Sequence, residues 1–243
     1  MTRNRQMTWL GARLVASGAV ALALLTGSAA SARGATSQPI VARMITAVSA
    51  ATAFRVVIDT TVSGGAAMMG SASRSHLEMI RVRHGATTQM SVITRSTSAK
   101  GPARVEEMVI VGTRGCVRLS HIGAWNCHYP PATFAAMATM NDPAKALQGL
   151  GLRLVMTPTG HSRTIGGQTC AVYAFTESLT TGGVVVASHG TWCLDAATSL
   201  PVEVDAVGSE AVIKGQLPFT TRSTSSYSRW NDPTLRVPAV PGL

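Results

Sequence analysis

The amino-acid sequence predicts an α+β protein built on one large, curved antiparallel sheet. Segments that alternate apolar and polar residues recur about every ten residues, as in a large sheet or open barrel. Glycine pairs such as Gly64-Gly65 and Gly166-Gly167 separate these segments. Only two regions have helical periodicity. Because two helices are too few to cover both faces of such a sheet, we expect them to cover its concave face.

The first 32 residues are predicted to be a secretory signal peptide. A basic start precedes an apolar segment from Leu14 to Leu25, and Ala30-Ser31-Ala32 suits cleavage after Ala32. A retained membrane anchor is the alternative, but the apolar segment is shorter than the roughly 20 residues that span a bilayer. The predicted domains are therefore the signal peptide at 1–32 and a single domain at 33–243. The domain ends in an extended, proline-rich tail that is not expected to pack deeply.

The mature chain is predicted to begin with a helix and continue mainly as strands. Ser37 caps a helix whose apolar residues recur at helical spacing from Ile40 to Val48. From Phe54 the period changes to two, as in a half-buried strand. Asn141-Asp142-Pro143 divides the second helical region into two pieces. Strands are expected at 54–62, 77–82, 88–95, 105–111, 116–120 and 124–128, and, after the broken helix at 132–150, at 152–156, 170–176, 184–188, 191–194, 202–206, 211–216 and 221–227.

Charge and aromatic content argue against a nucleic-acid partner. The formal net charge of +10 falls to +7 when the three arginines of the signal peptide are removed. The remaining arginines are scattered and only 5% of residues are aromatic. A nucleic-acid-binding protein normally has a basic stripe with interleaved aromatic residues. The expected partners of a secreted basic protein are an anionic membrane surface, anionic wall polymers or another envelope protein.

All four cysteines follow the predicted signal peptide. An even number of cysteines in an exported chain favours disulfides, and four cysteines allow three pairings. The simplest is the local pairing of Cys116 with Cys127 and of Cys170 with Cys193, because each bond would join neighbouring strands.

No catalytic or metal site is predicted. Cys116, His121, Cys127 and His128 are zinc-type donors, but they lack the short paired spacing of a zinc finger, and export favours oxidised thiols. The chain has no G-x-S-x-G nucleophile elbow and no phosphate-binding glycine loop. The adjacent pair Glu106-Glu107 points to opposite faces of a strand. We therefore expect no enzyme activity, no cofactor and no metal.

Several short motifs resemble the LolA-like family of envelope proteins. They are GTRGCVRL…GAWNC at 112–127, the turn from Thr164 to Gly167 before Tyr173, and LDAATSLPV at 194–202. The family includes periplasmic lipoprotein carriers, LppX- and LprG-type lipid-binding lipoproteins and sensor domains related to RseB. The resemblance implies an unclosed antiparallel half-barrel whose concave face, lidded by helices, holds an acyl chain or other apolar ligand. Many relatives are lipid-anchored through a cysteine, which is Ser28 here, so we expect a soluble secreted protein.

The leading hypothesis is a secreted, non-catalytic protein that binds or carries a lipid or other apolar molecule. The mature chain is rich in methionine, whose flexible side chain adapts to irregular partners. The alternative is an envelope interaction or sensor module with the same fold and no ligand, and a hydrolase comes third. Arg118 is expected at the rim, available for an anionic headgroup. The other candidate residues of the apolar wall and rim are Met79, Met108, Ile110, Val117, Leu119, Trp125, Phe134 and Met137.

Overall fold

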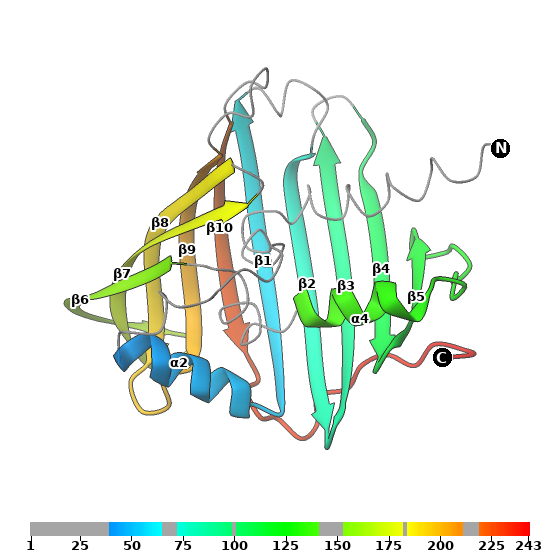
Figure 1. Ribbon diagram of the computed structural model, residues 1–243, viewed down its shortest axis with the longest axis horizontal. Coiled ribbons are helices and arrows are strands. Elements are labelled where there is room, and N and C mark those ends of the chain that lie inside the picture. Colours follow the sequence, from blue (N-terminus) through cyan, green and yellow to red (C-terminus); the bar gives the residue numbers. More distant parts are fainter. Residues whose placement is uncertain (1–38, 65–71, 99–100, 141–152, 182–183, 211–218) are drawn as a thin grey trace.

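The computed structural model describes residues 39–64, 72–98, 101–140, 153–181, 184–210 and 219–243. Over these residues, ten strands form one antiparallel sheet in the order β5-β4-β3-β2-β1-β10-β9-β8-β7-β6. The sheet is unclosed and curves into a half-barrel (Figure 1). The predicted signal peptide, the second piece of the broken helix and the strand expected at 211–216 lie outside the described residues.

Each half of the sheet is a meander of five strands. β1 and β10 pair in the middle of the sheet, from Arg55 with Ser228 to Gly64 with Phe219. The two halves therefore meet at a seam formed by the first and last strands of the chain. The strands are β1 (Ala53–Gly64), β2 (Ala72–His84), β3 (Thr87–Ser98), β4 (Arg104–Val111), β5 (Arg114–Leu119), β6 (Arg153–Ile165), β7 (Gln168–Thr181), β8 (Val184–Asp195), β9 (Pro201–Glu210) and β10 (Phe219–Ser228).

Two helices, α2 (Pro39–Ala50) and α4 (Pro131–Met140), lie on the same side of the sheet (Figure 1). α2 buries four apolar residues at the predicted spacing, from Val41 to Val48. The guanidinium of Arg83 donates hydrogen bonds to the last two carbonyl oxygens of α2. The helices are about 18 and 15 Å long, whereas ten strands extend over about 43 Å. Each described helix therefore contacts only part of the sheet. The expectation that helices cover the whole concave face stays a prediction.

Three strand predictions differ clearly from the structure. The strand expected at 152–156 is β6, which runs to Ile165. The expected strands at 184–188 and 191–194 form the single strand β8. Gly190 does not interrupt it, because the missing side chain lets β9 approach: a Cβ at Gly190 would lie 1.9 Å from the carbonyl oxygen of Asp205. The strand expected at 124–128 is reduced to one bridge between Asn126 and Val117.

The prediction that the C-terminal tail does not pack deeply is wrong. Leu235 is only 2% exposed and contacts Ala53 and Val82 on the outer face of the sheet. Val240 is 7% exposed and packs against Val109. The prolines of the tail prevent a regular strand, but they leave the apolar residues between them free to cover this face.

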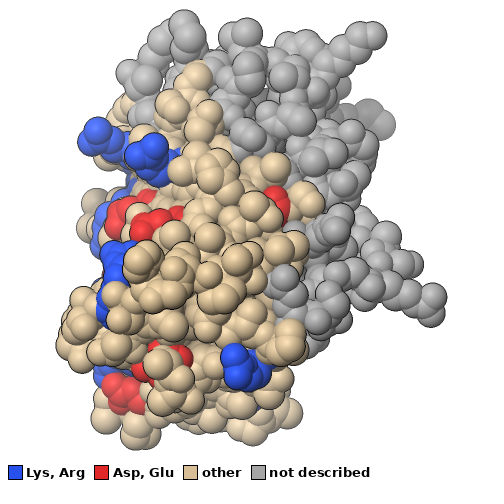
Figure 2. Space-filling model, turned by 90° about the vertical axis from the view of Figure 1, so that its left-hand side faces the viewer, with Lys and Arg blue, Asp and Glu red and all other residues tan. Residues whose placement is uncertain are grey.

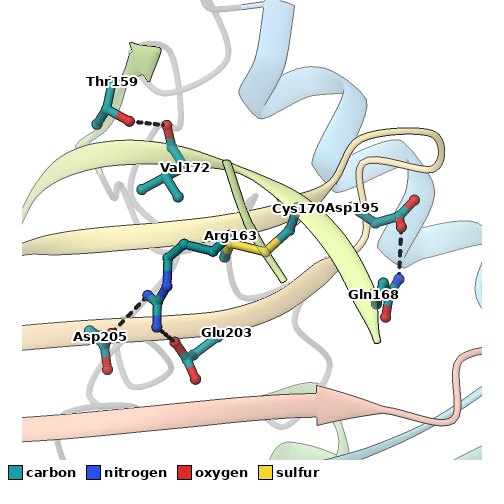
Figure 3. The surroundings of a disulfide bond; sticks show 9 residues. Thr159, Arg163, Gln168, Cys170, Val172, Asp195, Glu203 and Asp205 are labelled. Atoms are coloured by element: carbon teal, nitrogen blue, oxygen red, sulfur yellow. Dashed lines mark hydrogen bonds and ion pairs between the residues drawn. A yellow bond between two sulfur atoms is a disulfide. The ribbon is translucent and has the colours of Figure 1, made fainter. Parts of the chain in front are cut away.

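The local disulfide pairing is confirmed. Cys116 is bonded to Cys127 and Cys170 to Cys193, with sequence separations of 11 and 23 residues. The second bond joins β7 to β8 on the outer face (Figure 3). Two disulfides and no free cysteine indicate an oxidising, extracytoplasmic compartment. Within the described residues, no helix is both long enough and apolar enough to cross a bilayer.

Removal of the Cys170–Cys193 bond is expected to lower the free energy of unfolding by about 3 kcal/mol, because the bond restricts the unfolded chain. The measurement is urea denaturation of Cys170→Ala/Cys193→Ala beside the wild type. Cys116→Ala/Cys127→Ala is the comparison, and its shorter loop predicts a loss of about the same size or slightly smaller. Unchanged stability in both variants would contradict the prediction.

Candidate ligand-binding face of the sheet

The strand register aligns apolar residues in rows on the inner, concave face of β1–β5. One row runs straight across five strands, because Val117 pairs with Met108, Met108 with Val92, Val92 with Met79 and Met79 with Val56. The rows on either side extend this surface, and all its residues are buried in one cluster. We call this surface the apolar wall; its residues are Phe54, Val56, Ile58, Leu77, Met79, Met90, Val92, Met108, Ile110 and Val117.

α4 rests on the apolar wall through an aromatic anchor. Phe134 is 1% exposed and belongs to the same cluster as the wall. Its ring lies over Gly115, where an added Cβ would be 2.5 Å from the ring carbon Cδ1. The ring also meets Tyr129 edge to face, with centroids 5.8 Å apart. Met137 packs against the cluster while remaining partly exposed.

A second apolar cluster lies on the same face, beneath α2 and across β6–β9. It contains the four buried residues of α2 with Met156, Phe175 and Trp192. Phe175 and Trp192 meet edge to face, with centroids 6.2 Å apart. Tyr227 and Trp230 stack on each other at 5.8 Å and pack against both clusters. The inner face therefore has two apolar regions joined by an aromatic pair.

Small polar residues occupy the inner face near the seam. Thr60 pairs with Ser75 on β2 and with Ser223 on β10. These residues, with Thr221 and Ser225, are at least nine-tenths buried. We call these five residues the hydroxyl cluster. The hydroxyl of Thr221 donates to the carbonyl oxygen of Gly208 at 3.3 Å, whereas Oγ1 of Thr60 is buried without a hydrogen-bond partner.

Ionisable side chains also belong to the inner face. Burial raises the pKa of Glu177 on β7 to about 8, although a hydrogen bond with Ser188 opposes the shift. Burial also raises the pKa of Glu106 on β4, whose Oε1 has no hydrogen-bond partner. The guanidinium of Arg81 lies over the ring of Phe54, 5.8 Å from its centroid. Burial thus shifts both carboxyl groups, Glu177 and Glu106, towards their protonated, neutral form.

Six predicted site residues come together on the inner face. Met79, Met108, Ile110 and Val117 are part of the apolar wall, and α4 adds Phe134 and Met137. The sequence left open which side of β4 faces inward. Met108 and Ile110 are both part of the apolar wall, so the side of β4 that carries them is the inner one. Leu119, at the end of β5, is 62% exposed and lies outside the cluster.

Arg118 and Trp125, which were expected at the rim of the wall, lie on the outer face. The guanidinium of Arg118 is 4.6 Å from the centroid of Trp125. Its Nε donates to Oε2 of Glu107 at 2.8 Å, and His121 also contacts Glu107. The buried carboxylate of Glu107 therefore holds Arg118 on the outer face. From there Arg118 cannot contact the headgroup of a ligand on the apolar wall.

Charged pairs gather on the outer face. Arg163 lies 2.9 Å from Glu203 and 3.7 Å from Asp205, beside the second disulfide (Figure 3). Arg55 donates to Glu78 at 2.7 Å. In the view of Figure 2, most of the visible Arg side chains lie along the edge that faces away from the helices. Among the described residues, no group of three or more His, Cys, Asp or Glu side chains is arranged to hold a metal ion.

Neither the hydroxyl cluster nor Glu177 was predicted from the sequence. Thr221, Ser223 and Ser225 do recur with period two, which is the only signal for a shared face. The intervening residues of β10 are also polar, so alternation did not distinguish the buried side. Glu177 lies in a strand whose expected range ended at Thr176.

Comparison with known proteins does not assign this chain to a family. No protein-family model matches it, and no curated protein does. Among solved structures it is similar to a beta-barrel-like protein of the domain of unknown function DUF1849 from Brucella abortus, with 12% identity and a TM-score of 0.22 over 73% of this chain and 98% of that chain. The class that the fold itself defines is a disulfide-bonded, antiparallel half-barrel. The resemblance to the LolA-like family stays a prediction.

Proposed function

We propose that this protein is a secreted, non-catalytic half-barrel that binds a lipid or other apolar molecule on its concave face, with α4 as the lid. The observation that carries the proposal is the apolar wall. Ten apolar side chains form one surface across β1–β5, and this surface is about 19 Å wide at the usual strand spacing.

The wall and its lid suit a ligand of variable shape. Met79, Met90 and Met108 contribute flexible thioethers to the wall. α4 contacts it through Phe134 and Met137, so a small movement of this short helix would open the part of the surface beside β5. An acyl chain that buries about 300 Å² there would gain roughly 8 kcal/mol from apolar burial, before the entropic costs of binding are subtracted.

The test combines native mass spectrometry of the secreted protein with uptake of a fluorescent fatty acid. We expect a co-purifying apolar species and saturable uptake. Val92→Phe, which adds volume to the wall, is expected to reduce uptake at least about tenfold, the effect of losing roughly 1.4 kcal/mol of affinity. Ile93→Phe is the matched control, because Ile93 lies on the opposite face of β3.

Thermal unfolding of both variants shows whether either is misfolded, since overpacking costs about 1–3 kcal/mol. The absence of any bound apolar species together with no uptake by the wild type would refute the proposal. That outcome would favour the alternative of an envelope interaction module without a ligand.

A further inference from the structure

The hydroxyl cluster adjoins the apolar wall on the same face. Ile58 and Leu77 pair at the edge of the wall. Thr60 and Ser75 pair two residues further along the same strands, which is about 6.8 Å away. On the other side of β1, Ser223 pairs with Thr60. The inner face therefore changes from apolar to hydroxyl-bearing within one residue pair, at the middle of the sheet.

One hydroxyl at this boundary has unused hydrogen-bonding capacity. Thr60 is 4% exposed and its Oγ1 has no partner. Buried hydroxyl groups are normally hydrogen-bonded, because an unpaired one lowers stability. Thr60 can both donate to and accept from a polar group that is held beside the wall.

The surroundings of the cluster favour an uncharged partner. The row that contains Thr60 continues through Ser75 and Ser96 before it reaches a cation, the exposed Arg104 on β4. In the opposite direction, the row continues from Thr60 through Ser223 and Ala206 to Gly190 and Phe175. Glu177 belongs to the neighbouring row, where it pairs with Ser188. Among the described residues, a free carboxylate headgroup would thus find no neighbouring cation on this row. An ester or hydroxyl group would find several hydroxyl partners.

We infer that the ligand is an amphiphile with an uncharged, hydrogen-bonding headgroup of the acylglycerol type. Its acyl chain lies on the apolar wall and its headgroup contacts the hydroxyl cluster at Thr60, Ser75 and Ser223. This inference rests on the proposed function and adds the class of ligand. It also replaces the expectation of an anionic headgroup bound by Arg118, which is paired with Glu107 on the outer face.

The test compares two ligands that share one acyl chain. Monooleoylglycerol and oleate compete at pH 7 against 1-aminoanthracene as the fluorescent apolar probe. The wild type is expected to bind monooleoylglycerol at least about fivefold more tightly than oleate. Thr60→Val keeps the shape of the side chain and removes its hydroxyl. This change is expected to weaken monooleoylglycerol binding about two- to tenfold, the effect of one net hydrogen bond, and to leave oleate and probe binding unchanged.

Thr61→Val is the matched control, because Thr61 is exposed on the opposite face of β1. Thr60→Val should unfold at the same temperature as the wild type or higher, since it removes an unpaired buried hydroxyl. Tighter binding of oleate, or equal effects of Thr60→Val and Thr61→Val, would overturn the inference while probe binding still supports an apolar site. Failure of the wild type to bind the probe and both lipids would instead overturn the proposed function.

Discussion

Replacing Phe134 with alanine is expected to lower the free energy of unfolding by about 3–5 kcal/mol, the usual cost of removing a buried phenylalanine. Phe134 is 1% exposed and is the main contact between α4 and the apolar wall. The same change should release α4 from β5. Urea denaturation measures the loss, and Ile122→Ala is the control because Ile122 is 97% exposed.

The contact between Phe134 and Gly115 provides a second check of the same anchor. Gly115→Ala places a methyl group against the ring and should destabilise by about 1–3 kcal/mol through overpacking. In the double variant Phe134→Leu/Gly115→Ala, the narrower side chain should offset part of this loss, so the two effects should not add. Additive losses, or a Phe134→Ala variant as stable as Ile122→Ala, would show that α4 is not anchored at this point.

Lowering the pH from 8 towards 5 is expected to stabilise the protein through Glu177. Burial raises the pKa of this carboxyl from 4.5 to about 8. Between these values the folded state keeps a proton that the unfolded state has lost, so stability falls as the pH rises. The loss of stability caused by this group begins above about pH 4.5 and is complete above about pH 8. At 1.36 kcal/mol for each pH unit, the total is at most about 5 kcal/mol.

Glu177→Gln isolates this contribution from that of the histidines, which titrate in the same range. The variant and the wild type should have similar stability at pH 5, because both side chains are then neutral. At pH 8.5 the variant should be clearly more stable. Urea denaturation at both pH values gives the difference in free energy of unfolding. A difference that does not change with pH would show that Glu177 titrates normally in the folded state.

Local patterns predicted most of the fold because one-sided burial leaves a clear period. β1 alternates cleanly, and both β1 and β9 were placed within a few residues of their observed bounds. The structure also explains why β4 was ambiguous. Val109 is buried on the outer face by the tail residue Val240, so β4 is apolar on both sides. Val109 and Val240 are far apart in the sequence, so their contact gives no local periodicity from which it could be predicted.

The candidate site was predicted only where its residues are apolar. Met108, Ile110 and Val117 could be assigned to a wall because hydrophobic residues in a strand are expected to face a core. Arg118 was misplaced because the sequence does not show that Glu107 lies beside it on the neighbouring strand. The hydroxyl cluster combines residues of β1, β2 and β10 and depends on the pairing of β1 with β10. That pairing could not be derived from spacing.

The seam between β1 and β10 also has a consequence for the order in which the protein folds. Every other strand pairing joins strands that follow each other in the chain, so each five-stranded meander can form from local contacts. β1 is synthesised first among the strands and β10 last. During synthesis, β1 is therefore an open strand edge, prone to pairing with other chains until β10 arrives. The hydroxyl cluster, which needs both strands, is completed only when the last strand has been added.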